Sequence, residues 1–262
     1  MNLLDIENRS NENKKLGKFN RFSARSALDN KHKYLWEKGA DLFIPQINKL
    51  LNNEKYKMKI INIQEFKNIN QEKLGELFNK YGSDKASKHD YYIIYSYILT
   101  KLGLNSELNI LEIGLGTNNT KILSNMGKNA KPGASLRAFE DFLPKSNIYG
   151  ADIDKNILFN ENRIKTTYIN QLDEKTFENV NNFGNIEYDI IIDDGLHSIT
   201  ANLNTLFFAL NKVKKNGWII IEDIYLIDNW NVVDFILSKN NEYEIFIVCN
   251  KKERYQFVVH KL

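Results

Sequence analysis

Cysteine, proline and long apolar runs are all scarce in this chain of 262 residues. Its single cysteine, Cys249, excludes an internal disulfide and a cysteine-rich zinc site. No apolar run approaches the roughly 18–20 residues that span a membrane. The first residues also lack the apolar segment and cleavage site of a secretory signal. We therefore expect a cytoplasmic protein without a membrane span.

A strong excess of one charge is missing as well. The chain has 36 Lys and Arg against 33 Asp and Glu, a net charge of +3. This balance argues against a nucleic-acid partner, which a basic surface would attract. Hydrophobic residues make up 42% of the chain, enough for a full core, so a mostly disordered protein is excluded.

The pattern of apolar residues in the sequence changes near residue 105. Before it, apolar residues recur at helical spacing in residues 34–51, 72–78 and 91–102, while residues 58–63 could form a strand or a bridge. We predict that residues 1–105 form a helical N-terminal region that covers the site, selects the substrate or makes oligomer contacts.

Residues 106–262 alternate between short apolar runs and helical patterns. The expected strands are residues 108–113, 148–153, 166–169, 188–192, 217–221, 243–248 and 255–259. Residues 199–213 form an amphipathic helical pattern. Strands that are apolar on both faces and separated by helices indicate a parallel sheet with both faces covered. Because the last two runs are too close for a crossover helix, they should form an antiparallel hairpin. The prediction is an α/β, Rossmann-like fold with a mostly parallel seven-stranded sheet.

A turn with two glycines follows the first of these strands. Gly114 and Gly116 would let the chain turn tightly and bring backbone N–H groups to a ligand, and Glu112 precedes them. Asn119 stands where a dinucleotide fingerprint has its third glycine. Asp152 ends the second strand, where a carboxylate can bind a ribose diol. The pattern predicts a cofactor site, although an ordinary strand-to-helix turn can look similar.

Acidic residues end the fourth and fifth strands. Asp194, Glu222 and Asp223 should converge, because the carboxyl ends of parallel strands form one edge of the ligand crevice. Three carboxylates repel one another unless a cation lies among them, and oxygen ligands suit Mg²⁺ or Ca²⁺. His197 could take a proton from a hydroxyl bound to such a metal. The alternative interpretation is that Asp193 and Asp194 are strand-end caps and His197 only begins a helix.

These motifs resemble known families. The E-x-G-x-G turn with an Asp ending the next strand is similar to the class I S-adenosylmethionine (SAM) methyltransferases. The Asp-Asp-Gly-x-His and Glu-Asp strand ends resemble the metal-dependent sugar O-methyltransferases of macrolide biosynthesis. Residues 80–85, followed by His89 and Tyr92, and residues 133–144 agree with that family. The likeness covers about residues 75–225.

The resemblance implies a class I methyltransferase fold and a role for each motif residue. The cofactor-binding residues would be Glu112, Gly114, Gly116, Asp152, Gln171 and Asp193. The metal ligands would be Asp194, Glu222 and Asp223, and the catalytic residues would be Asp194 and, as the general base, His197. The chain departs from the family after the third strand, where Asn170 replaces the Asp of Gly-Asp-Gln.

Other residues have simpler interpretations. Trp218 and Trp230 follow strand and helix periodicity and should pack in the core. His32 and His260 are expected to be structural or surface residues. Tyr81 and His89 are equally compatible with a lid over SAM and with plain packing.

We therefore expect a Mg²⁺-dependent SAM O-methyltransferase acting on a hydroxyl of a sugar or sugar-containing compound. The high content of Asn, Lys and Ile favours a bacterial surface (capsular) polysaccharide pathway over antibiotic synthesis. One alternative is methylation of an oxygen in a phosphate-like glycan modification. Others are a non-catalytic SAM-binding subunit and an NAD-dependent oxidoreductase. The expected partner is a small molecule or a glycan, and a homo-oligomer is compatible with the sequence.

Overall fold

The computed structural model describes residues 49, 51 and 56–262. Most of the helix predicted at residues 34–51, and His32, lie outside this part of the chain. Within the described residues, no helix is both long enough and apolar enough to cross a bilayer. The predicted boundary between residues 105 and 106 stays a prediction.

The described residues form one sheet of nine strands, in the order β1-β8-β9-β7-β6-β2-β3-β5-β4. The strands are β1 (Ile60–Asn62), β2 (Asn109–Ile113), β3 (Asn147–Asp152), β4 (Asn160–Glu161), β5 (Ile164–Tyr168), β6 (Tyr188–Asp193), β7 (Val213–Ile224), β8 (Tyr243–Cys249) and β9 (Tyr255–Lys261). Seven of them are the predicted strands. The prediction of seven strands missed the short strands at the two edges, β1 and β4, of which only β1 had been considered.

The ends of the sheet depart from the parallel pattern of its centre. Strands β8 and β9 form the predicted antiparallel hairpin, and β9 also pairs antiparallel with β7. The edge strand β4 pairs antiparallel with β5, while β1 pairs parallel with β8. The centre of the sheet is parallel throughout: each strand in the order β7-β6-β2-β3-β5 pairs parallel with the next.

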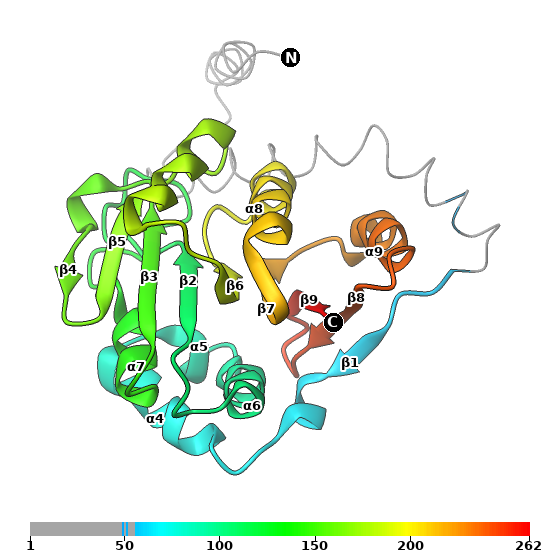
Figure 1. Ribbon diagram of the computed structural model, residues 1–262, viewed down its shortest axis with the longest axis horizontal. Coiled ribbons are helices and arrows are strands. Elements are labelled where there is room, and N and C mark those ends of the chain that lie inside the picture. Colours follow the sequence, from blue (N-terminus) through cyan, green and yellow to red (C-terminus); the bar gives the residue numbers. More distant parts are fainter. Residues whose placement is uncertain (1–48, 50, 52–55) are drawn as a thin grey trace, which may run out of the picture.

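Helices cover both faces of the sheet (Figure 1). The α-helices are α4 (Gln71–Tyr81), α5 (Asp84–Ser87), α6 (Tyr92–Leu102), α7 (Ala134–Phe142), α8 (Ile199–Lys212) and α9 (Asn231–Ser238). The 3-10 helices are η1 (Ile63–Phe66), η2 (Lys155–Ile157), η3 (Glu174–Phe183) and η4 (Ile227–Trp230). Helices α4, α6 and α7 pack on one face, whereas α8 and α9 pack on the other.

Alternation along the strands divides the core into two clusters. In β2, Ile110 belongs to the cluster under α4, α6 and α7, and its neighbour Leu111 belongs to the opposite one. Trp218 lies in the first cluster and Trp230 in the second, with 4% and 2% of their surface exposed. The prediction that both tryptophans pack in the core is confirmed. His260 stacks on Trp218, with ring centroids 3.9 Å apart, so its structural role is confirmed too.

Strand register brings the predicted site residues to one edge of the sheet. Ile113 at the end of β2 pairs with Asp193 at the end of β6, and Asp193 pairs with Ile221 in β7. The residues that follow these three positions therefore lie side by side. They are the glycine turn, the loop that begins with Asp194, and the Glu222–Asp223 pair.

Candidate active site

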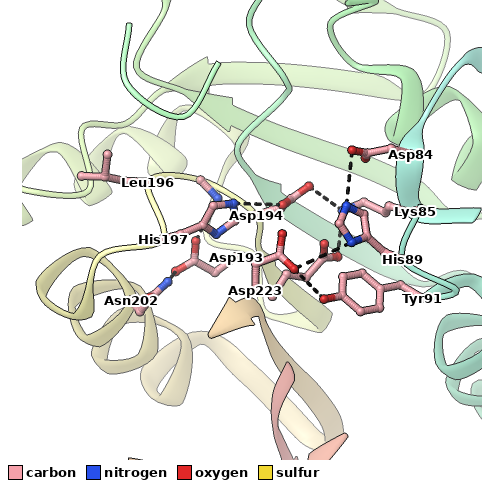
Figure 2. Close-up of polar contacts among 12 residues, drawn as sticks. Asp84, Lys85, His89, Tyr91, Asp193, Asp194, Leu196, His197, Asn202 and Asp223 are labelled. Atoms are coloured by element: carbon pink, nitrogen blue, oxygen red, sulfur yellow. Dashed lines mark hydrogen bonds and ion pairs between the residues drawn. The ribbon is translucent and has the colours of Figure 1, made fainter. Parts of the chain in front are cut away.

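A lysine lies at the centre of the acidic cluster (Figure 2). The Nζ atom of Lys85 is 2.7 Å from Asp194 Oδ2, 2.7 Å from Glu222 Oε1 and 3.1 Å from Glu112 Oε1. The side chain of Lys85 is only 1% exposed. Burial by itself lowers its pKa, but the nearby carboxylates outweigh this effect and raise the pKa well above its usual value. In this structure the Lys85 ammonium is thus the cation beside two of the three acids that were expected to require one, Asp194 and Glu222, and beside Glu112.

In the motif at residues 80–85, helix α4 ends and helix α5 begins, and this change of direction places the Lys85 side chain in the acidic cluster. Helix α4 ends at Gly82, whose φ of 86° suits glycine and whose N–H donates to Phe78 O at 2.9 Å. Ser83 then caps α5, accepting a hydrogen bond from the backbone N–H of Lys85. Tyr81 points elsewhere: its hydroxyl donates to Asp141 on α7, at an exposed contact between helices.

Two glutamates complete the buried part of the cluster. Glu222 accepts hydrogen bonds from Lys85 and from the Tyr95 hydroxyl, and Glu112 accepts one from Ser135 at 2.6 Å. Burial is the main cause that raises the pKa of both glutamates, and the charge of Asp194 adds to it for Glu222. One Lys85 ammonium therefore faces three carboxyl groups in this cluster.

His197 lies beside Asp194 at the edge of the sheet. Its Nε2 atom is 3.6 Å from Asp194 Oδ1, while Lys85 holds the other oxygen of the same carboxylate (Figure 2). The buried Nδ1 atom of His197 has no hydrogen-bond partner among the described residues. The backbone of His197 is left-handed, with a φ of 53°, and Ser198 caps helix α8 directly after it. The imidazole is therefore held at the edge of the sheet beside a carboxylate.

Two predicted cofactor-binding residues, Asp193 and Gln171, hold the loop around His197 through hydrogen bonds. Asp193 is fully buried and accepts hydrogen bonds from the side chains of Gln171 and Asn202, at 2.8 and 3.0 Å. Gln171 in turn accepts one from the backbone N–H of Leu196 at 2.7 Å. Burial raises the pKa of Asp193. In this structure both side chains support the loop, and their contacts with a cofactor stay predictions.

Asp223 faces a separate set of partners. Its Oδ1 atom accepts a hydrogen bond from Tyr91 at 2.6 Å and lies 4.0 Å from His89 Nδ1. His89 stacks on Tyr91, and its Nε2 atom is 3.5 Å from Asp84 Oδ2. Burial raises the pKa of Asp223, but the charge of His197 and the Tyr91 hydrogen bond outweigh it, so the pKa is lowered. His89 is therefore a site residue, whereas Tyr81 is not.

The glycine turn borders a cavity of about 320 Å³, lined by Gly114, Gly116, Lys85 and Asp194 among others. Both glycines have positive φ angles, 100° at Gly114 and 74° at Gly116. A Cβ atom on Gly114 would lie 2.0 Å from the backbone oxygen of Asp194. Glycine is thus needed at 114 for the turn to pack against the Asp194 loop, and the contact of this turn with a cofactor stays a prediction.

Asp152, the last residue of β3, and Asp154, which follows the strand, have different surroundings. Asp152 is buried, and its oxygens accept hydrogen bonds from the backbone N–H groups of Leu115 and Asp154, at 2.7 and 2.8 Å. It therefore holds the glycine turn in place. Asp154 accepts a hydrogen bond from Thr117 and lines a second cavity of about 460 Å³. The ribose-binding role of Asp152 stays a prediction, and Asp154, although it is buried as well, is the one of the two that lines this cavity.

The predicted metal ligands fit a divalent cation in chemistry but not in arrangement. All three offer carboxylate oxygens at one edge of the sheet, which suits Mg²⁺. Asp194 and Glu222, however, direct oxygens to Lys85, and Asp223 directs one to Tyr91. Across the described residues, no three His, Cys, Asp or Glu side chains are close enough to hold a metal ion together. The ligand set stays a prediction.

Three site residues were not identified from the sequence: Lys85, Tyr91 and Tyr95. Lys85 is the last residue of the motif at residues 80–85, and its place in that motif was the signal that could have identified it. The two tyrosines lie four residues apart at the start of α6, a spacing that puts both on one side of the helix. The sequence predicted a helix over residues 91–102 within the N-terminal region, without a role for either tyrosine in the site.

Comparison with known proteins gives partial matches, and no family model matches the chain. It is 34% identical over 123 residues to the mycinamicin VI 2''-O-methyltransferase of Micromonospora griseorubida, which is 46% of this chain and 28% of that protein. It is 29% identical over 153 residues to an 8-demethyl-8-alpha-L-rhamnosyl tetracenomycin-C 2'-O-methyltransferase of Streptomyces olivaceus, covering 58% and 37% of the two proteins. The chain thus spans less than two fifths of the length of either relative.

Solved structures show the same fold. The MycE methyltransferase of the mycinamycin pathway, determined with Mg, SAH and mycinamycin VI, has a TM-score of 0.56 and 20% identity to this chain. The match covers 72% of this chain and 54% of MycE. The fold is therefore that of the class I methyltransferases, and the resemblance to sugar O-methyltransferases that the motifs indicated is confirmed.

Proposed function

We propose that this chain is a SAM-dependent O-methyltransferase that methylates a hydroxyl of a sugar or of a sugar-containing small molecule. The observation that carries the proposal is the position of His197. Its imidazole lies 3.6 Å from Asp194 Oδ1, and Asp194 also lines the cavity formed by the glycine turn. A proton acceptor thus stands beside the predicted cofactor site.

The protein's own residues would act as follows. Gly114 and Gly116 present backbone groups to the methionine part of SAM, which when bound supplies a methyl group on its sulfonium. His197 accepts the proton of the acceptor hydroxyl while the oxygen takes the methyl group, leaving S-adenosylhomocysteine (SAH). Asp194 orients the imidazole and stabilises its charged form. Charge and atoms balance without any other reactant.

Magnesium belongs to the same proposal. MycE was determined with Mg, and Asp194, Glu222 and Asp223 are the residues that would hold such an ion here. When bound, it would supply Lewis acidity toward the acceptor hydroxyl. The role of residues 1–105 in acceptor choice, a homo-oligomer and a cytoplasmic setting stay predictions.

The acceptor class is open to direct test. By their names, the relatives are O-methyltransferases for mycinamicin VI, demethylmacrocin and an 8-demethyl-8-alpha-L-rhamnosyl tetracenomycin-C. None of these names refers to a polysaccharide, so a surface glycan is a second acceptor class to compare with glycosylated small molecules. A phosphate-like glycan modification is a third.

Two measurements test the proposal. Calorimetry should show SAH binding and much weaker NAD binding, whereas tighter NAD binding would indicate an oxidoreductase. Transfer from radiolabelled SAM should then be measured with glycosylated macrolides, nucleotide sugars and glycan fragments, in EDTA and in Mg²⁺. A labelled methyl group found on an oxygen of any sugar supports the proposed function. SAH binding with no transfer to any acceptor class would point to a non-catalytic SAM-binding subunit.

A further inference from the structure

We propose that the Lys85 ammonium and a divalent cation compete for the carboxylates of Asp194 and Glu222. The inference rests on the proposed function for the identity of the ion, and it assigns a role to a lysine that lies inside the site. Lys85 then holds the acidic cluster together when no metal is bound, and the ion binds only as the ammonium leaves.

The contacts of Lys85 support the first half of this proposal. Its Nζ atom reaches one oxygen of Asp194 and one of Glu222 at the same distance, 2.7 Å. Both carboxylates are at predicted metal-binding positions: Asp194 directly follows β6, and Glu222 lies in the neighbouring strand β7. Glu222 and Lys85 are 2% and 1% exposed, so water does not screen the pair. The ammonium thus occupies the position between the two strands that a bridging cation would need.

A divalent ion cannot share this position. Mg²⁺ binds oxygen at about 2.0–2.1 Å and requires near-octahedral geometry. An ion that contacted the same oxygens would therefore lie a few ångströms from the ammonium, in a poorly screened environment where like charges repel strongly. The described residues accordingly show a lysine-centred cluster and no group of three acids or histidines gathered for a metal.

The structure also provides a place for the displaced ammonium. Lys85 lines the cavity of about 320 Å³ next to the glycine turn, so its long side chain can turn into open space. Glu112, 3.1 Å away and outside the predicted metal set, remains available as its partner. The exchange would leave each charge in the site paired.

Metal titration of the full-length protein tests the competition. Mg²⁺ is titrated by calorimetry into wild type, Lys85→Met and the control Lys214→Met, whose lysine makes a 2.7 Å ion pair with Asp189 outside the site. Removal of the Lys85 charge should tighten Mg²⁺ binding at least about tenfold, and the control should match wild type. Equal or weaker binding by Lys85→Met overturns the proposal, including the case in which neither protein binds Mg²⁺.

A second measurement needs no variant, in case Lys85→Met does not fold. Lys85 should resist an amine-acylating reagent in EDTA and become reactive at saturating Mg²⁺, as read by peptide mass spectrometry. Lys80, 59% exposed, serves as the internal control that reacts in both conditions. A Lys85 that stays protected at saturating Mg²⁺ overturns the proposal. SAH binding is measured separately, so a failure of the proposed function is distinguishable from a failure of the competition.

Discussion

His197 is the residue on which the proposed chemistry depends. It combines a buried nitrogen that has no hydrogen-bond partner among the described residues, a left-handed backbone and a carboxylate 3.6 Å from its other nitrogen. Within the same part of the chain the Nδ1 atom of His89 also lacks such a partner, but His89 lies beside Asp223 and Asp84. The two histidines can therefore be distinguished by substitution.

Replacing His197 with Ala should lower kcat about 10²–10⁴-fold, the usual contribution of a general base, with little change in SAH affinity. His197→Gln should be nearly as poor, because an amide does not accept the proton. Steady-state kinetics and SAH calorimetry check both statements. A His197→Ala enzyme with near-normal kcat would show that the base is elsewhere, and His89→Ala is the next variant to measure.

At the scale of elements, substitutions in the glycine turn after β2 can distinguish an effect on cofactor binding from an effect on folding. Alanine at Gly116 would adopt a left-handed φ at a cost of about 1–2 kcal/mol, and its Cβ would meet the flexible side chain of Met126, with Cγ at 3.2 Å. Alanine at Gly114 would collide with the backbone of the Asp194 loop.

We expect Gly116→Ala to remain folded and to bind SAH roughly tenfold more weakly, since the strained turn presents its N–H groups less well. Gly114→Ala should lose much more stability. Thermal unfolding followed by circular dichroism, together with SAH calorimetry, measures the two effects. Equal Tm values for the two variants would contradict the close packing described at Gly114.

Helix α9 gives a second element-scale prediction, away from the site. Asp234 of α9 accepts a hydrogen bond from Tyr56 at 2.8 Å, and burial raises the pKa of this aspartate. Burial also raises the pKa of Tyr56 to about 12, so its hydroxyl stays a donor at ordinary pH.

A raised carboxyl pKa means that the folded state holds the proton more tightly than the unfolded state. Its stabilising contribution is therefore complete below the unfolded pKa, and it is lost as pH rises through the folded pKa. The free energy of unfolding of wild type minus that of Asp234→Asn should thus be larger near pH 4 than at pH 7. Urea unfolding across this range checks the sign, and a difference that grows with pH would contradict it.

At the scale of the whole molecule, the lysine-centred cluster joins distant parts of the chain. Lys85 and Tyr95 come from α5 and α6, while Glu112, Asp194 and Glu222 come from β2, the loop after β6, and β7. The cluster therefore ties the first helices to the centre of the sheet.

The position of each acid within this cluster predicts the cost of its removal. Glu222→Ala should destabilise the protein by about 2–5 kcal/mol, because it leaves the buried Tyr95 hydroxyl and Lys85 short of a partner. Asp194→Ala should cost clearly less, since its side chain is 26% exposed. Urea unfolding in EDTA measures both, and the reverse order would contradict the burial pattern.

Much of the fold was determined by local sequence patterns. Alternating apolar residues specify which strand residues face each core, and the short gap between β8 and β9 requires a hairpin. The convergence of Asp194, Glu222 and the glycine turn follows from parallel pairing alone, because parallel strands end at the same edge.

Only the tertiary structure decided which cation the acids hold and what surrounds each histidine. Lys85 is 109 residues from Asp194 and 137 from Glu222, and Tyr91 is 132 residues from Asp223. Such contacts depend on how α5 and α6 pack against the sheet, which no local spacing encodes. Burial then raises the pKa of Glu112, Asp193 and Glu222. A pattern of residues can therefore predict that acids meet, but the packing around them determines their charges and partners.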